Sequence, residues 1–180
     1  MRHLSSAAAL LLSLGTPAHL AGAEPGDPVV SEVVVDAPVQ AVWDALTTRD
    51  GMEAWATASH SEIELALGEI WRSSYSANST LDDDSVIETE VLAFDPPRML
   101  AARTRKPPAD FPFPNAILRT WYVTYLEPVG ETRTRVIHRM FGFTDDEESQ
   151  KMRAFFVRGN QYSLEQLATY LANVARQPGA

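Results

Sequence analysis

The hydrophobic positions of this chain change their spacing along its length, and each spacing predicts a type of element. Residues 29–35 are rich in β-branched valine and predict a strand, whereas the apolar residues of 39–46 recur at helical spacing. A second short helix is predicted over 49–56. From 63 to 143 the pattern mostly alternates with a period of two, which is typical of antiparallel strands joined by turns.

The C-terminal part of the chain predicts one long amphipathic helix. Apolar residues keep a helical period over 152–174, after the predicted capping residue Thr144 and an acidic run. A helix over 145–176 would be roughly 45 Å long, and we expect a bend or a close contact at Gly159. Its apolar stripe must be buried, and the sheet is the only large surface available.

This order of elements predicts an α+β fold. We expect a curved antiparallel sheet of about six to seven strands wrapped around the long C-terminal helix, with two short helices after the first strand. A sheet that wraps around a single helix leaves a cavity between them, and such a cavity is the natural place for a ligand.

The N-terminal residues predict export. Residues 1–23 combine Arg2, an apolar run over 4–14 and small residues at their end, which is typical of a cleavable secretory signal peptide. Residues 24–28 would form a tether and 29–177 a single domain. No other apolar stretch approaches the roughly 20 residues of a membrane span, so we expect a periplasmic or secreted protein without stable membrane insertion.

The composition narrows the classes of function. The chain has 180 residues, no cysteine and a formal net charge of −9, so disulfides are excluded and nucleic acid is disfavoured as a partner. Only His60 and His138 lie beyond the predicted signal peptide, and their spacing suggests no metal site. No nucleophile elbow or phosphate-binding glycine loop is found. We therefore expect no metal and no cofactor, and enzymatic activity is not favoured.

Four stretches carry a resemblance to a known family: 36–38 with 42–47, Met52 with Trp55, 90–98, and 132–138 with 142–143. In this order they resemble the helix-grip fold of the START-like, or SRPBCC, superfamily, and within it the branch named after activators of the Hsp90 ATPase. The resemblance implies a fold but not one function, because the superfamily includes lipid carriers, steroid- and phenol-binding proteins, cyclases and chaperone cofactors. The predicted export argues against Hsp90 itself as the partner.

Candidate ligand-binding residues are those expected on the face of the sheet or helix that lines the cavity. They are Trp71, Tyr75, Trp121, Tyr125, His138, Met140, Phe156 and Gly159. Each aromatic residue has ordinary core packing as its alternative. His138 either hydrogen-bonds a ligand, acts as a general base or is a hydrogen-bonded core histidine. Gly159 either widens the cavity or lets the helix approach the sheet.

Three functions remain open at this point. The first is an exported binding protein for a small hydrophobic or aromatic molecule. The second is an enzyme of the cyclase, dehydratase or hydrolase kind that uses His138. The third is a protein-binding, chaperone-like factor of the cell envelope, in which Phe111 and Phe113, held out by the prolines of the loop 106–114, contact the partner. That loop could equally be a lid over the cavity.

Overall fold

The computed structural model describes residues 24, 26–56, 58–76 and 78–176. The predicted signal peptide, residues 1–23, lies outside these residues. The elements in chain order are β1 (Val29–Val35), α1 (Val39–Thr47), α2 (Arg49–Trp55), β2 (His60–Glu62), β3 (Ile70–Ser74), β4 (Ile87–Asp95), β5 (Met99–Lys106), α3 (Pro114–Ile117), β6 (Trp121–Pro128), β7 (Thr134–Phe141) and α4 (Glu147–Ala175). Within the described residues, no helix is both long and apolar enough to cross a membrane.

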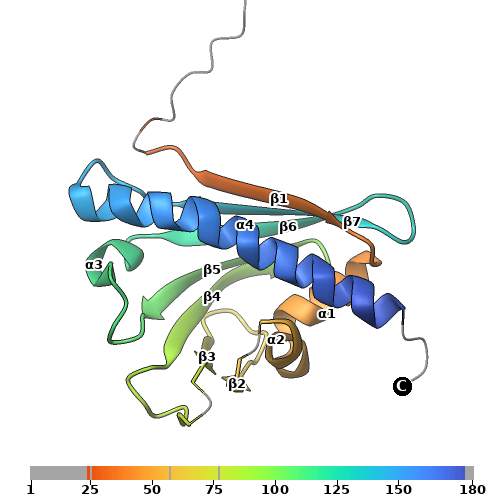
Figure 1. Cartoon of the computed structure of the whole chain (residues 1–180), viewed down its shortest axis with the longest axis horizontal. Coiled ribbons are helices and arrows are strands. Elements are labelled where there is room, and N and C mark those ends of the chain that lie inside the picture. The colour runs from red at the N-terminus through yellow and green to blue at the C-terminus, as the bar shows by residue number, and fades with distance from the viewer. Residues whose placement is uncertain (1–23, 25, 57, 77, 177–180) are drawn as a thin grey trace, which may run out of the picture.

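One curved, open sheet of seven strands forms the body of the fold. The strands follow the order β1-β7-β6-β5-β4-β3-β2, and every neighbouring pair is antiparallel. The long helix α4 lies across one face of this sheet, and the short helices α1 and α2 lie near its C-terminal end (Figure 1). The predicted α+β helix-grip architecture is confirmed.

The N-cap of helix α4 lies two residues after the predicted capping residue. Asp146, not Thr144, is the N-cap: its carboxylate accepts a hydrogen bond from the Ser149 backbone N–H at 3.0 Å. The Thr144 hydroxyl donates to the same Asp146 side chain at 2.6 Å. The acidic first turn, Glu147 and Glu148, is as expected and suits the positive end of the helix dipole. Gly159 does not interrupt the helix.

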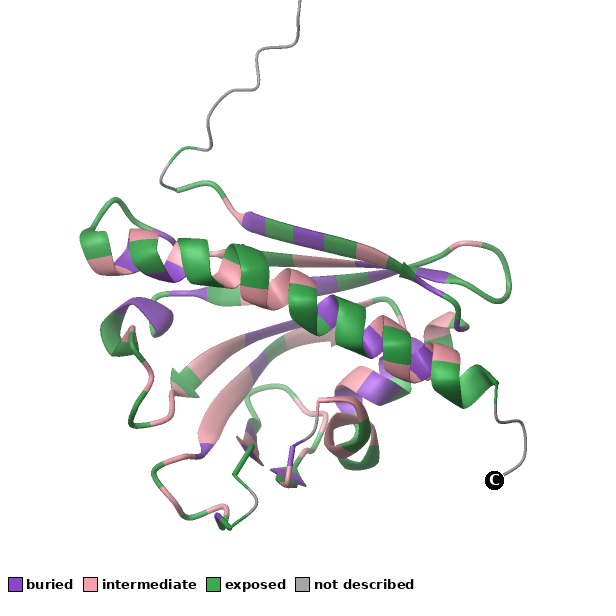
Figure 2. Ribbon diagram, in the orientation of Figure 1, coloured by how far each residue is buried: buried purple, intermediate pink, exposed green. Residues whose placement is uncertain are grey.

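Two separate hydrophobic clusters hold α4 against the rest of the fold. The C-terminal half packs Leu164, Leu167 and Leu171 into the main core, which includes residues of α1 and of the sheet. The N-terminal half packs Met152, with Phe156 against it, into a smaller cluster around α3. Buried and exposed positions alternate along the helix as one apolar stripe requires (Figure 2).

The proline-rich loop folds onto α4 instead of standing away from it. The Phe111 and Phe113 rings contact each other at 5.7 Å between centroids, and both lie close to Phe155, at 6.2 and 5.9 Å. The expectation that prolines hold these rings out is wrong, because their apolar surface is partly buried against the smaller cluster. The loop also ends in the short helix α3, which the sequence pattern did not predict.

Gly51 in α2 and Gly159 in α4 give a matched test of how closely each helix packs against its neighbours. A Cβ at Gly51 would lie 2.5 Å from the Asp44 carbonyl oxygen, whereas one at Gly159 would meet only the Phe155 ring, at 3.9 Å. We expect Gly51→Ala to lower the free energy of unfolding by about 1–3 kcal/mol, since α2 must move off α1. Gly159→Ala should raise it by about 0.5–1 kcal/mol through helix propensity. Urea unfolding measures both, and equal effects would contradict the close approach.

Candidate functional site

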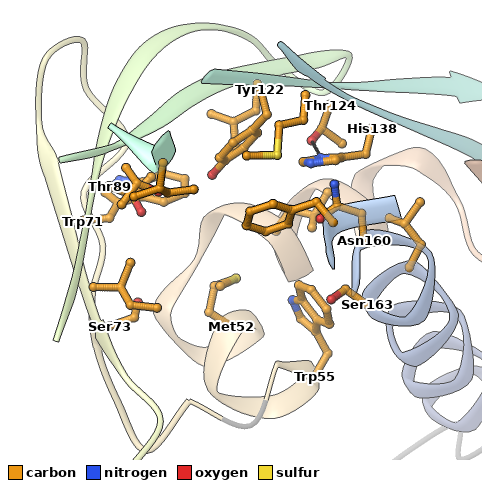
Figure 3. Close-up of a pocket in the computed structure, with 18 of the residues that line it drawn as sticks. Met52, Trp55, Trp71, Ser73, Thr89, Tyr122, Thr124, His138, Asn160 and Ser163 are labelled. Atoms are coloured by element: carbon orange, nitrogen blue, oxygen red, sulfur yellow. Dashed lines mark hydrogen bonds between the residues drawn. The ribbon is translucent and has the colours of Figure 1, made fainter. Parts of the chain in front are cut away.

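A cavity of about 330 Å³ lies between α4, the short helices and the covered face of strands β3 to β7 (Figure 3). Its apolar lining comes from Leu46, Met52, Trp55, Trp71, Ile87, Leu100, Ile117, Met140, Phe156 and Leu164. Its polar lining comes from Ser73, Tyr75, Thr89, Thr104, Tyr122, Thr124, His138, Asn160 and Ser163. Of the described residues that line it, none is an acid, a lysine or an arginine.

The strand register places the polar groups of β6 and β7 on the face that lines the cavity. Tyr122 pairs with Met140, and Thr124 lies directly opposite His138. Because side chains directly opposite in an antiparallel pair share one face of the sheet, all four point the same way. The alternation along β7 buries Thr134, Val136 and Met140, as predicted for the face that carries His138.

His138 is held as a neutral imidazole at the cavity wall. Its Nδ1 forms a hydrogen bond with the Thr124 hydroxyl at 3.0 Å, and its ring lies 5.0 Å from the Tyr122 ring. Burial lowers the pKa of His138 to about 4, because the charged form is poorly solvated there. The side chain is partly buried and lines the cavity. No residue in the described part of the chain hydrogen-bonds its other ring nitrogen, Nε2.

Tyr122 adds a neutral hydroxyl to the same wall. Burial raises the pKa of Tyr122, and interaction with Tyr75 raises it further. Both tyrosines line the cavity, so its wall contains two phenol groups. A phenol that resists ionisation remains a hydrogen-bond donor at every pH at which the protein works.

Helix α4 contributes two polar side chains to the cavity wall, within a stripe of the helix that is otherwise apolar. Asn160 and Ser163 line the cavity between Phe156 and Leu164. In Figure 3 the Asn160 amide lies on the side of α4 that faces the His138 ring. The Asn160 Nδ2 is buried and has no hydrogen-bond partner. The cavity therefore has an unpaired amide opposite an unpaired ring nitrogen.

The two tryptophans that line the cavity are fixed by hydrogen bonds to the backbone. The Trp55 indole N–H donates to the Ala45 carbonyl at 2.8 Å, and the Trp71 indole N–H donates to the Glu64 carbonyl at 2.7 Å. Because these N–H groups already have partners, both residues contribute rigid apolar walls.

The cavity adjoins a second hollow that lies between α2 and α4. This hollow of about 340 Å³ shares Met52, Trp55, Tyr75 and Ser163 with the cavity, and is completed by Ala56, Tyr162 and Gln166. No described residue that lines either hollow belongs to the loop 106–114. The loop lies beside the N-terminal half of α4, where the Phe111 ring is 6.3 Å from the ring of the cavity-lining Phe156.

Five of the eight candidate residues line the cavity: Trp71, Tyr75, His138, Met140 and Phe156. The placement of Trp121 and Tyr125 on the cavity face is wrong. They keep 40% and 39% of their surface exposed, on the opposite face of the sheet. Trp121 stacks there on Phe141, with 4.3 Å between ring centroids. The error is a shift of one residue in β6, which reverses the face of every side chain.

Gly159 neither lines the cavity nor brings the helix close to the sheet. The residue that does face the cavity is its neighbour Asn160, at helical spacing from Phe156 and Leu164. A polar residue within an apolar i, i+4, i+8 series was the signal that could have found it. Thr124 could have been found only from the register with His138.

The described residues offer no cluster for a metal ion. Across 24–176, with positions 25, 57 and 77 not described, no group of three or more His, Cys, Asp or Glu side chains could hold one. The chemistry of this site is that of neutral hydrogen bonds within an apolar enclosure.

The sheet, the single long helix and the cavity between them define a helix-grip protein of the START-like superfamily. Residues 36–172 match the family model described as activator of Hsp90 ATPase homolog 1-like protein, and the chain belongs to this family. No curated protein matches it.

Several solved structures share the fold at low sequence identity. Protein MLL2253 from Mesorhizobium loti is 22% identical with a TM-score of 0.64, and the match covers 81% of this chain and 97% of that one. Protein NE0264 from Nitrosomonas europaea is 15% identical with a TM-score of 0.61, covering 84% and 97%. An Hsp90 activator from Plasmodium falciparum is 12% identical with a TM-score of 0.60, covering 82% and 97%.

The lowered pKa of His138 predicts a pH-dependent stability. Since its pKa is about 4 in the folded state and 6.5 in an exposed histidine, the unfolded chain takes up the proton first. The protonation of His138 therefore leaves the free energy of unfolding unchanged above about pH 6.5 and lowers it as the pH falls toward 4. We expect the unfolding free energy of His138→Phe, measured against the wild type from pH 7.5 to 4, to shift in favour of the variant by roughly 2–3 kcal/mol. If the difference in unfolding free energy between His138→Phe and the wild type did not change with pH, the burial of a neutral imidazole would be contradicted.

Proposed function

We propose that this chain is an exported binding protein that holds a small hydrophobic or aromatic molecule in the cavity between the sheet and α4. The observation that carries the proposal is the cavity itself, which is about 330 Å³ and mainly apolar, and is bounded by the rigid rings of Trp55 and Trp71. A cavity of about 150 Å³ holds one benzene ring, so this one has room for two or three fused rings. Its family has a fold that commonly binds ligands.

The state of His138 favours binding over acid–base catalysis. The geometry that an enzyme would need is partly present, because His138 lines an open cavity and hydrogen-bonds Thr124. A base with a pKa of about 4 is nevertheless weak at neutral pH, since catalysis works best when the pKa lies near the working pH. A neutral imidazole of this kind is better suited to fixing the orientation of a ligand than to removing a proton.

The contacts of the proline-rich loop favour a small ligand over a protein partner. A chaperone-like role would have used Phe111 and Phe113 as exposed contacts, but these rings pack against the rings of α4. The name of the Plasmodium falciparum structure concerns that protein, and at 12% identity it supports the fold alone. Export would also separate this chain from Hsp90 and from nucleic acid, and we propose neither as a partner.

Filling the cavity tests the binding proposal. Thr89 lies inside the cavity on β4, whereas Thr169 lies on the exposed side of α4. We expect Thr89→Phe to weaken the binding of tetralin, a two-ring hydrocarbon, at least about tenfold, since the new ring occupies its volume. Thr169→Phe is the matched control and should bind tetralin as the wild type does. Calorimetry, or the change in the tryptophan emission of the chain, measures this binding. If Thr89→Phe bound tetralin as tightly as the wild type does, the binding site would not be this cavity.

Export has its own test. When the full chain is expressed in a bacterial host, we expect the periplasmic or secreted fraction to contain a protein that begins at Glu24, as read by N-terminal mass spectrometry. Replacing both Ala21 and Ala23 with arginine should leave the uncleaved chain in the membrane or cell fraction, because the peptidase requires small residues there. Wild-type protein of full length in the cytoplasm would contradict the proposal.

A further inference from the structure

Several polar groups at the cavity wall lack a hydrogen-bond partner among the described residues, and three of them lie around the His138 ring and the facing side of α4. These three are the Nε2 atom of His138 on β7, the hydroxyl of Tyr122 on β6 and the side-chain amide of Asn160 on α4. They come from three different elements, yet all three line one enclosure (Figure 3). The N–H groups of the cavity's tryptophans, in contrast, all have backbone acceptors.

An unpaired polar group is costly in an enclosure of this kind. A buried donor without an acceptor loses its hydration and gains nothing in return. The Asn160 Nδ2 is in this position. A leucine at 160 would continue the stripe formed by Phe156 and Leu164 without this cost. The amide is therefore placed where a further molecule in the cavity can satisfy it.

The enclosure also excludes formal charge. The described lining residues include no acid, lysine or arginine, and His138 lines the cavity as a neutral ring. A carboxylate or an ammonium group brought into this cavity would lose its hydration without meeting an opposite charge. A neutral oxygen meets no such obstacle, since hydroxyl, amide and imidazole groups can all pair with it.

Building on the proposed function, we propose that the ligand is an uncharged, otherwise apolar ring compound with one hydrogen-bonding oxygen, held between the Asn160 amide and His138. The oxygen is that of a carbonyl or a hydroxyl group. The terminal torsion of asparagine is broad and roughly two-fold, so the amide can turn its NH₂ group to a carbonyl oxygen. A hydroxyl can accept from Asn160 while it donates to the His138 ring.

A series of probes on one ring system tests this inference. The probes are tetralin, tetralone, tetralol, the carboxylate of tetralin and its ammonium analogue, titrated calorimetrically into the full chain at neutral pH. We expect tetralone or tetralol to bind roughly ten times more tightly than tetralin, because the oxygen satisfies Asn160. Both charged probes should bind at least about ten times more weakly than tetralin. The preference between tetralone and tetralol identifies the kind of oxygen.

Variants of Asn160 show whether this residue carries the preference. Asn160→Leu should reduce the ratio of oxygenated-probe to tetralin affinity from roughly ten to about one, while tetralin binding is retained. Asn160→Ser, which also removes the amide but stays polar, serves as the second variant if the leucine disturbs folding. Asn173→Leu makes the same change on the exposed end of α4 and should leave the ratio unchanged.

The outcomes separate this inference from the proposed function. If tetralin binds but the oxygenated probes bind no better, or if the ratio survives in both Asn160 variants, the assignment of Asn160 is wrong and the proposed function stands. If a charged probe binds most tightly, the requirement for an uncharged ligand is wrong. If no probe binds at all, the proposed function itself is overturned.

Discussion

The fold depends on one constraint: a single long helix must cover a sheet that is too wide for it to fill. Helix α4 is anchored at its two ends by separate hydrophobic clusters, around Met152 at one end and around Leu167 at the other. Between these anchors the apolar stripe is interrupted by Asn160. The cavity lies at this interruption. Its presence therefore follows from where the helix is anchored, and it needs no special element to hold it open.

The composition of the cavity wall follows from the same arrangement. A region that was meant to close would carry leucine or isoleucine on both sides, since protein interiors pack to the density of organic crystals. Here the helix carries Asn160 and the sheet carries Thr124 with His138. The strand register places Thr124 opposite His138, so a hydrogen bond within the sheet fixes the imidazole before any ligand binds. The rings of Trp55 and Trp71 are fixed in the same way by the backbone.

The sequence was sufficient for the architecture and insufficient for the orientation of one strand. The valine-rich strand 29–35 and the long C-terminal helix were recognisable because their periodicity extends over many residues. The residues of β6 have apolar or aromatic side chains on both faces, so periodicity could not tell which face was covered. Trp121 and Tyr125 were chosen for their size, yet it is Tyr122 that faces the cavity. That choice depends on pairing with β7, which is a tertiary property.

Charge is distributed so that the two faces of the sheet have different roles. Arg103 pairs with Glu90 at 2.7 Å, and Arg135 pairs with Glu32 at 3.1 Å, all on the face away from α4. These partly exposed pairs contribute little stability, but they keep ionised groups where water can solvate them. The described residues that line the cavity carry only neutral polar groups, and the lowered pKa of His138 keeps its imidazole neutral as well. Selectivity in such a cavity must come from shape and from the match of hydrogen bonds, because no fixed charge is available to discriminate one ligand from another.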